Sequence, residues 1–230
     1  MCSDRPKWFR LNVLNLATRV QSASALSFSA FLALHLAAPL AAALGADASG
    51  VMLLTREYYQ TSLIEPILVW GSLAAHVLSG LTRRALLGSK TKRFSLHSIA
   101  GFVLIPVALG HSFTHRILPA RKGISPSLLS YQFVSYSLFV YPFTSWTGYG
   151  VLILAASYHA TGGLRTILSG RKKAARLPDS NAGQAGYAAA VGALGLGLVN
   201  LAFEGKEVPL WLARRYAEVV KAAYKPTSLW

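Results

Sequence analysis

Four of the six histidines have positions at which their side chains could do chemistry, namely His35, His76, His111 and His159. Each lies within a long stretch that contains no Asp, Glu, Lys or Arg. Imidazole is the commonest metal ligand among side chains and can also carry a proton. A titratable side chain inside a stretch long enough to cross a bilayer marks a functional site.

These uncharged stretches predict transmembrane helices. About 20 mainly apolar residues are needed to cross the roughly 30 Å hydrocarbon layer. The chain is 53% hydrophobic and only 13% charged, whereas about 25% of the residues of a soluble domain are charged. We therefore predict an all-α, polytopic membrane helix bundle. Its five spans lie at about residues 23–44, 62–82, 97–117, 146–167 and 184–203.

The segment 127–144, rich in Tyr, Phe and Ser, can be interpreted in two ways. Its composition suits the aromatic belt at a membrane interface. Pro142 would then mark a break before the fourth span. The alternative is a sixth span in place of this segment. We favour the interfacial interpretation.

Basic residues set the orientation and explain the net charge of +15. The N-terminus, the 83–93 loop and the 165–176 loop carry four, five and five Lys or Arg, and the two opposite loops carry one and three. With five spans the strongly basic segments share one side, so the N-terminus is expected in the cytosol. Charges placed between spans are topology signals, and no nucleic-acid partner is indicated. Residues 1–22 form a cytosolic or interfacial segment, residues 23–204 the membrane domain, and residues 205–230 an amphipathic tail.

The depths of the histidines predict two pairs. Successive spans run in opposite directions, and each histidine lies in the later part of its span. His35 and His111 are therefore expected toward the non-cytosolic side, and His76 and His159 toward the cytosolic side. Two imidazoles that face each other across a bundle suit a six-coordinate haem b, as in electron-transfer proteins. The single cysteine excludes an internal disulfide and covalent haem attachment. The hypothesis is two non-covalent b-type haems.

Glycines follow two of these histidines at the same distance. Gly80 lies four residues after His76, and Gly163 lies four residues after His159. Residues four apart share a helix face, and a flat haem needs a small residue beside its ligand. Both glycines are therefore predicted to pack against haem.

The first and third spans also match each other. Gln21 precedes His35 by 14 residues, and His97 precedes His111 by 14. Together with the glycine match, this indicates two similar helical hairpins, offset by 76 positions in the first helix and 83 in the second, plus a fifth helix.

Basic side chains near the span ends could pair with haem propionates. Arg83 and Arg84 are candidates on the cytosolic side, and His115 and Arg116 on the other side. His115 also competes with His111 as the iron ligand, because it lies one turn further along the same helix face. We favour His111.

Other interpretations of the histidines stay open. They can be interhelical hydrogen-bond partners, which contribute about 0.6 kcal/mol each on average in a membrane. They can also form a metal site or a proton relay, although the Asp and Glu side chains that such sites prefer are missing nearby. A transporter would show a pair of broken helices at matching positions. Pro39 and Pro106 could each kink a span, but no such pair is evident.

The four-histidine pattern resembles the di-haem cytochrome b membrane anchor of succinate dehydrogenases and fumarate reductases. The resemblance implies the same two pairs, His35 with His111 and His76 with His159. It also implies the alternative function, an electron-transfer subunit that anchors a quinone-linked dehydrogenase. The chain itself is not expected to be an enzyme, and no catalytic residue is predicted.

The flanking motifs resemble the fungal mitochondrial adapter family, the Mdm-complementing proteins, over roughly residues 20–205. They are R-E-Y-Y-Q (56–60), H-V-L-S-G-L (76–81), H-S-I-A-G (97–101), H-S-F-T-H-R (111–116) and Y-H-A-T-G-G (158–163). This resemblance implies an outer mitochondrial membrane protein that acts in lipid homeostasis at organelle contacts. The partners it implies are membrane lipids and a bridge-type lipid-transfer protein, recruited through a Pro-x-Pro motif in the N-terminal tail. The chain departs from that pattern, because no two of its ten prolines are separated by one residue.

Overall fold

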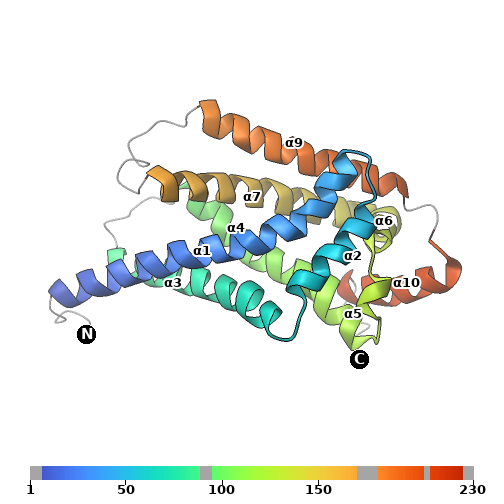
Figure 1. The fold of residues 1–230 in the computed structure, drawn as a ribbon, viewed down its shortest axis with the longest axis horizontal. Coiled ribbons are helices and arrows are strands. Elements are labelled where there is room, and N and C mark those ends of the chain that lie inside the picture. The colour runs from blue at the N-terminus through green and yellow to red at the C-terminus, as the bar shows by residue number, and fades with distance from the viewer. Residues whose placement is uncertain (1–6, 89–94, 170–180, 205–207, 225–230) are drawn as a thin grey trace. The chain divides into compact units, whose positions relative to one another are not determined.

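A computed structural model describes residues 7–88, 95–169, 181–204 and 208–224, and every regular element in these ranges is a helix (Figure 1). The all-α prediction is confirmed. The α-helices are α1 (Lys7–Ala43), α2 (Ala48–Tyr59), α3 (Ser72–Leu87), α4 (Leu96–Ser112), α5 (Leu118–Arg121), α6 (Tyr131–Val140), α7 (Pro142–Ser169), α9 (Asn181–Glu204) and α10 (Leu210–Tyr224). Two π-helices, η1 (Glu65–Gly71) and η3 (Phe113–Ile117), and one 3-10 turn, η4 (Pro126–Leu128), complete the described elements.

Four helical segments among the described residues are long and apolar enough to cross a membrane. They are α1, the continuous run Leu96–Arg121, α7, and Ala182–Phe203 within α9. They coincide with the first, third, fourth and fifth predicted spans, as expected of a multi-pass membrane protein. The predicted span 62–82 instead consists of η1 followed by the 16-residue α3. Each piece alone is shorter than the bilayer requires.

The chain forms two compact units. Unit 1 lies within residues 1–37 and 54–94, and unit 2 within residues 38–53 and 95–230. Most of the first predicted span and all of the second lie in unit 1, and the remaining predicted spans lie in unit 2.

In unit 1, α1 is one helix that starts at Lys7, so the described part of the predicted segment 1–22 continues into the first span. Residues 1–6 lie outside the described residues. Polar contacts join α1 to α3. Arg83 donates from Nε to Thr18 Oγ1 over 3.0 Å and from Nη1 to Gln21 Oε1 over 2.7 Å. α3 ends at Gly88, whose positive φ of 57° suits a glycine better than any other residue.

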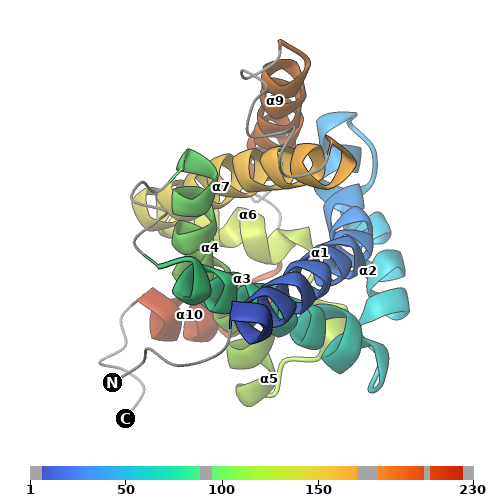
Figure 2. The ribbon, with the colours of Figure 1, turned by 90° about the vertical axis from the view of Figure 1, so that its left-hand side faces the viewer.

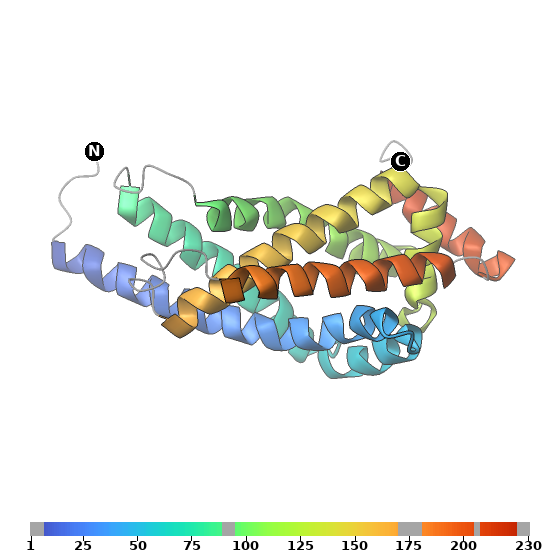
Figure 3. The same cartoon turned by 90° about the horizontal axis from the view of Figure 1, so that it is seen from above.

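In unit 2, α7 contacts α4, α6 and α9 (Figure 2, Figure 3). The helix begins at Pro142, which confirms the predicted break. Proline suits the first turn of a helix, because the N–H it lacks has no partner there.

The aromatic segment forms α6, which has 10 residues and a length of about 15 Å. It is too short to cross a membrane, and the alternative of a sixth span is wrong for this segment. Tyr131 and Phe133 are buried within unit 2 rather than exposed as lipid-facing anchors. Ser135 Oγ donates to the carbonyl of Leu201 on α9. Composition alone could not separate an interfacial aromatic segment from a buried one.

The end of α1 and the first residues of α2 belong to unit 2. A Cβ at Gly197 would collide with the carbonyl oxygen of Pro39, so the backbones of α9 and α1 approach closely there. Asn200 Nδ2 donates to the carbonyl of Ala42 over 2.8 Å. Small residues and amide hydrogen bonds are the usual means by which membrane helices associate.

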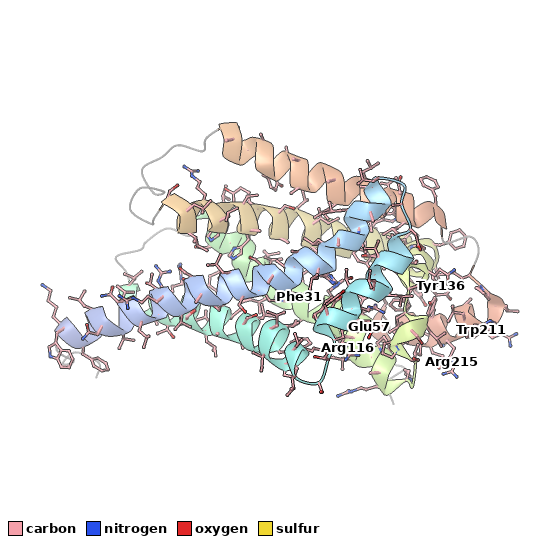
Figure 4. All side chains as sticks on the ribbon, in the orientation of Figure 1. Phe31, Glu57, Arg116, Tyr136, Trp211 and Arg215 are labelled. Carbon is pink, nitrogen blue, oxygen red and sulfur yellow. The ribbon has the colours of Figure 1, made fainter. Side chains whose placement is uncertain are left out.

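The amphipathic tail forms α10 in its described part, residues 208–224. Leu212, Tyr216, Val219 and Val220 form a buried stripe at helical spacing. This stripe packs against the Leu118 and Phe133 cluster of unit 2, and the Tyr216 hydroxyl donates to the carbonyl of Leu128. Trp211 and Arg215 are exposed on α10 (Figure 4). The apolar face of the tail therefore packs on protein.

Candidate functional site

His159 is tethered to α4 in unit 2. Its Nδ1 lies 3.1 Å from the carbonyl oxygen of His97. A carbonyl can only accept, so Nδ1 carries the proton and donates it. In this tautomer the lone pair is on Nε2, the atom that can bind a metal. The imidazole rings of His97 and His159 are also stacked, with centroids 4.3 Å apart and planes at 7°.

Glycines make room for this stacked pair. A Cβ at Gly101 would lie 2.8 Å from Cε1 of His159, and a Cβ at Gly162 would lie 2.8 Å from Nδ1 of His97. The predicted haem-packing residue Gly163 faces the same ring, at 3.7 Å from its Cε1. The small residues of α4 and α7 therefore accommodate imidazole in the described structure. His97, Gly101 and Gly162 were not among the predicted site residues, although the match between His97 and Gln21 was a sign of the first.

His76 is tethered in the same way in unit 1. Its Nδ1 lies 3.1 Å from the carbonyl oxygen of Gln21 on α1, so Nδ1 again donates and Nε2 again holds the lone pair. A Cβ at Gly80 would lie 2.9 Å from Nε2 of Gln21. The same contact thus occurs once in each unit, between residues that the offsets of 76 and 83 relate to each other.

His35 is held by aromatic residues of unit 1. Its Nδ1 lies 3.4 Å from the hydroxyl of Tyr59, at the end of α2. Its ring stacks on Phe31, with centroids 5.2 Å apart and planes at 26°. Phe31 in turn makes an edge contact with Tyr59. Tyr59 belongs to the R-E-Y-Y-Q motif, which was the one available sign of its importance.

His111 and His115 lie next to each other in unit 2, with ring centroids 4.6 Å apart. The π-helix η3 starts two residues after His111 and contains His115. π-helical turns often occur at functional sites. The Nε2 of His115 is 2.8 Å from the hydroxyl of Tyr149 on α7. The choice of His111 over His115 as an iron ligand stays a prediction.

The predicted propionate partners have different surroundings. Arg83 donates to Thr18 and Gln21, so it links α1 to α3. Arg84 and Arg116 are half-buried. His115 Nε2 is hydrogen-bonded to the hydroxyl of Tyr149.

The predicted ligand pairs take one histidine from each unit. Contacts inside a unit do not test them, and both pairs stay predictions. Within unit 2 the structure brings together His97 with His159 and His111 with His115. Among the described residues, no group of three or more His, Cys, Asp or Glu could hold a metal ion.

Fold and composition define the class of this protein, a multi-pass helical membrane protein whose described residues include four helices able to cross a bilayer. No protein-family model, curated protein or solved structure matches the chain.

Proposed function

We propose that this chain is a mitochondrial membrane protein that holds two b-type haems through His76, His159, His35 and His111. The main support for this proposal is a hydrogen bond that occurs twice, which we call the tether. The Nδ1 of His76 donates to the Gln21 carbonyl, and the Nδ1 of His159 donates to the His97 carbonyl, each over 3.1 Å. This repetition also supports a bundle built from two similar hairpins and a fifth helix.

The tether matters because of what iron requires from imidazole. A ligating histidine almost always donates its second ring N–H to a carbonyl, carboxylate or water, which fixes the tautomer and makes the ligand more basic. His76 and His159 already have this arrangement. A histidine that only joins two helices would form the same hydrogen bond to a carbonyl, so haem content is the measurement that separates the two roles.

The remaining ligands follow from depth and from the local contacts. His35 and His111 are proposed as the second pair. The proposed propionate partners are Arg83, Arg84, His115 and Arg116. A bound haem would supply one-electron chemistry. The contribution of the chain is to orient the imidazoles and to surround them with apolar helices.

The proposal includes five membrane crossings. η1 and α3 are continuous in the chain and contain 7 and 16 residues. At 1.5 Å per residue their combined length is roughly 34 Å, enough for the roughly 30 Å hydrocarbon layer. With this crossing the strongly basic segments share one side, and the N-terminus is cytosolic.

A reduced-minus-oxidised absorption spectrum of the purified protein, with pyridine-haemochrome quantitation, tests the haem proposal. We expect a sharp low-spin b-type signal with about two haems per chain, and loss of one haem in His76→Ala and in His159→Ala. Gln21→Ala is the matched control for His76, because it keeps the backbone carbonyl that accepts from Nδ1. A well-folded wild-type protein without haem would refute the proposal.

The proposed cellular role is lipid homeostasis at the outer mitochondrial membrane. It is supported by the positions of the motif residues that resemble the adapter family. Tyr59, His111, His115, His159 and Gly162 all belong to these motifs, and all make the contacts described above. A tagged chain should fractionate with outer mitochondrial membranes, and its deletion should change the mitochondrial phospholipid profile. The proposed partner is a bridge-type lipid-transfer protein.

The alternative, an electron-transfer subunit, is supported by the same histidines. It predicts a different set of partners. A redox anchor should co-purify with a flavin or iron–sulfur subunit, whereas a lipid-homeostasis protein should co-purify without one.

A further inference from the structure

Unit 2 has an apolar groove between α7 and α9, with a cavity volume of about 310 Å³. The two helices lie along each other (Figure 1, Figure 3). The residues that matter for the argument are Trp146, Gly150 and Leu154 on α7 and Val191, Gly195 and Val199 on α9.

Two glycines create the hollow, one from each helix. A Cβ added at Gly150 or at Gly195 would meet no atom within 4 Å, so it would project into open space. The side chains of Leu154 and Val199 flank this bare backbone and are 48% and 40% exposed. The groove is therefore apolar and open to its surroundings.

Both helices that form the groove can cross a membrane, so an exposed apolar groove on them opens toward lipid. Trp146 lies four residues after the start of α7 and is 38% exposed. Tryptophan at this depth is typical of the membrane interface, where its N–H meets lipid head groups. From Trp146 to Leu154 the groove runs about 12 Å into the hydrocarbon layer.

We propose that this groove binds one acyl chain of a membrane phospholipid, with the glycerol ester region near Trp146. The hollow has a volume of about 310 Å³ and an apolar lining, which suits a chain of methylenes. A helix of a second copy is disfavoured, because close helix pairs use small residues spaced along one helix, whereas here each helix supplies one glycine to the groove. This inference is independent of haem binding.

Photo-crosslinking tests the proposal. The protein is reconstituted in phosphatidylcholine vesicles that contain a phosphatidylcholine with a diazirine on one acyl chain, and adducts are mapped by peptide mass spectrometry. We expect adducts concentrated in residues 146–154 and 191–199. The variant Gly150→Leu with Gly195→Leu fills the groove and should lose them.

Gly148→Leu with Gly192→Leu is the matched control. Neither glycine lines the groove, and a Cβ at either position also meets nothing within 4 Å. Both variants add the same apolar volume to the same helices and remove two helix-weakening glycines. Circular dichroism shows whether both fold. Loss of adducts in the filled variant alone supports the proposal. Equal labelling of the two variants, or crosslinks between two protein copies at these residues in place of lipid adducts, would overturn it.

Discussion

Gly101→Ala should push His159 off its tether. The added Cβ would lie 2.8 Å from Cε1 of the imidazole, whereas carbon atoms in contact lie about 3.5–4.0 Å apart. The ring must therefore move away from α4 by about 0.7 Å or more. The carbonyl of His97 lies on the same helix, one turn earlier. The present 3.1 Å separation between this oxygen and Nδ1 would then lengthen toward about 3.8 Å, beyond hydrogen-bonding range.

The expected cost of this change in folding free energy has three parts. A lost hydrogen bond costs about 1 kcal/mol, and overpacking costs about 1–3 kcal/mol. Replacing glycine by alanine inside a helix returns about 1 kcal/mol. We expect Gly101→Ala to destabilise the protein by about 1–3 kcal/mol.

Gly110→Ala is the control, because this glycine lies on the same helix and a Cβ there meets nothing within 4 Å. It should stabilise the protein by up to about 1 kcal/mol. Denaturant unfolding in mixed micelles measures both changes, and the haem spectrum reports whether the His159 environment has altered. Equal unfolding free energies for the two variants, with unchanged spectra, would show that the Gly101 contact does not hold the ring.

Three further variants test other contacts. Arg83→Met removes two charge-assisted hydrogen bonds between α3 and α1 and should lower the unfolding free energy by about 2 kcal/mol; an unchanged value would mean that these bonds contribute nothing net. Tyr149→Phe removes the partner of His115 Nε2 and should cost about 1 kcal/mol. Haem content measured by pyridine haemochrome should stay unchanged, and a loss of haem would implicate His115 as a ligand. Gly197→Ala should reduce the yield of folded protein on size-exclusion chromatography, because the new Cβ meets a backbone oxygen of α1 that cannot move aside. Gly195→Ala is the control and should fold normally, because a Cβ there meets open space.

The positions of the membrane helices could be predicted because lipid imposes a simple requirement on the sequence. A span must be uncharged and about 20 residues long, and the ends of α7 and α9 fall within a few residues of the predicted limits. The start of α1 at Lys7 could not be predicted in this way. Hydropathy locates the part of a helix that lies in lipid and carries no information on how far the helix continues beyond it.

The site was predictable in its residue types but not in its contacts. The uncharged stretches identified all four histidines, yet nothing in them indicated that Tyr59 and Tyr149 would meet His35 and His115. These partners come from distant segments of the chain, and tyrosine is equally suited to a membrane interface. The haem-packing role expected for Gly163 stays a prediction, and in the described structure a Cβ there would lie 3.7 Å from Cε1 of His97.

The repeated tether does not depend on the side chain at its acceptor position. The contact uses the backbone carbonyl of residue 21 or 97, and this residue is Gln in one unit and His in the other. The donor is an imidazole in both units. A glycine lies beside this side chain in both units: Gly80 faces Gln21, and its counterpart Gly163 faces His97, although His97 is approached more closely by the preceding residue, Gly162. Gln21→His should therefore leave the protein folded if the imidazole ring fits beside Gly80. Gly80→Ala should lower the free energy of unfolding more when residue 21 is histidine than when it is glutamine.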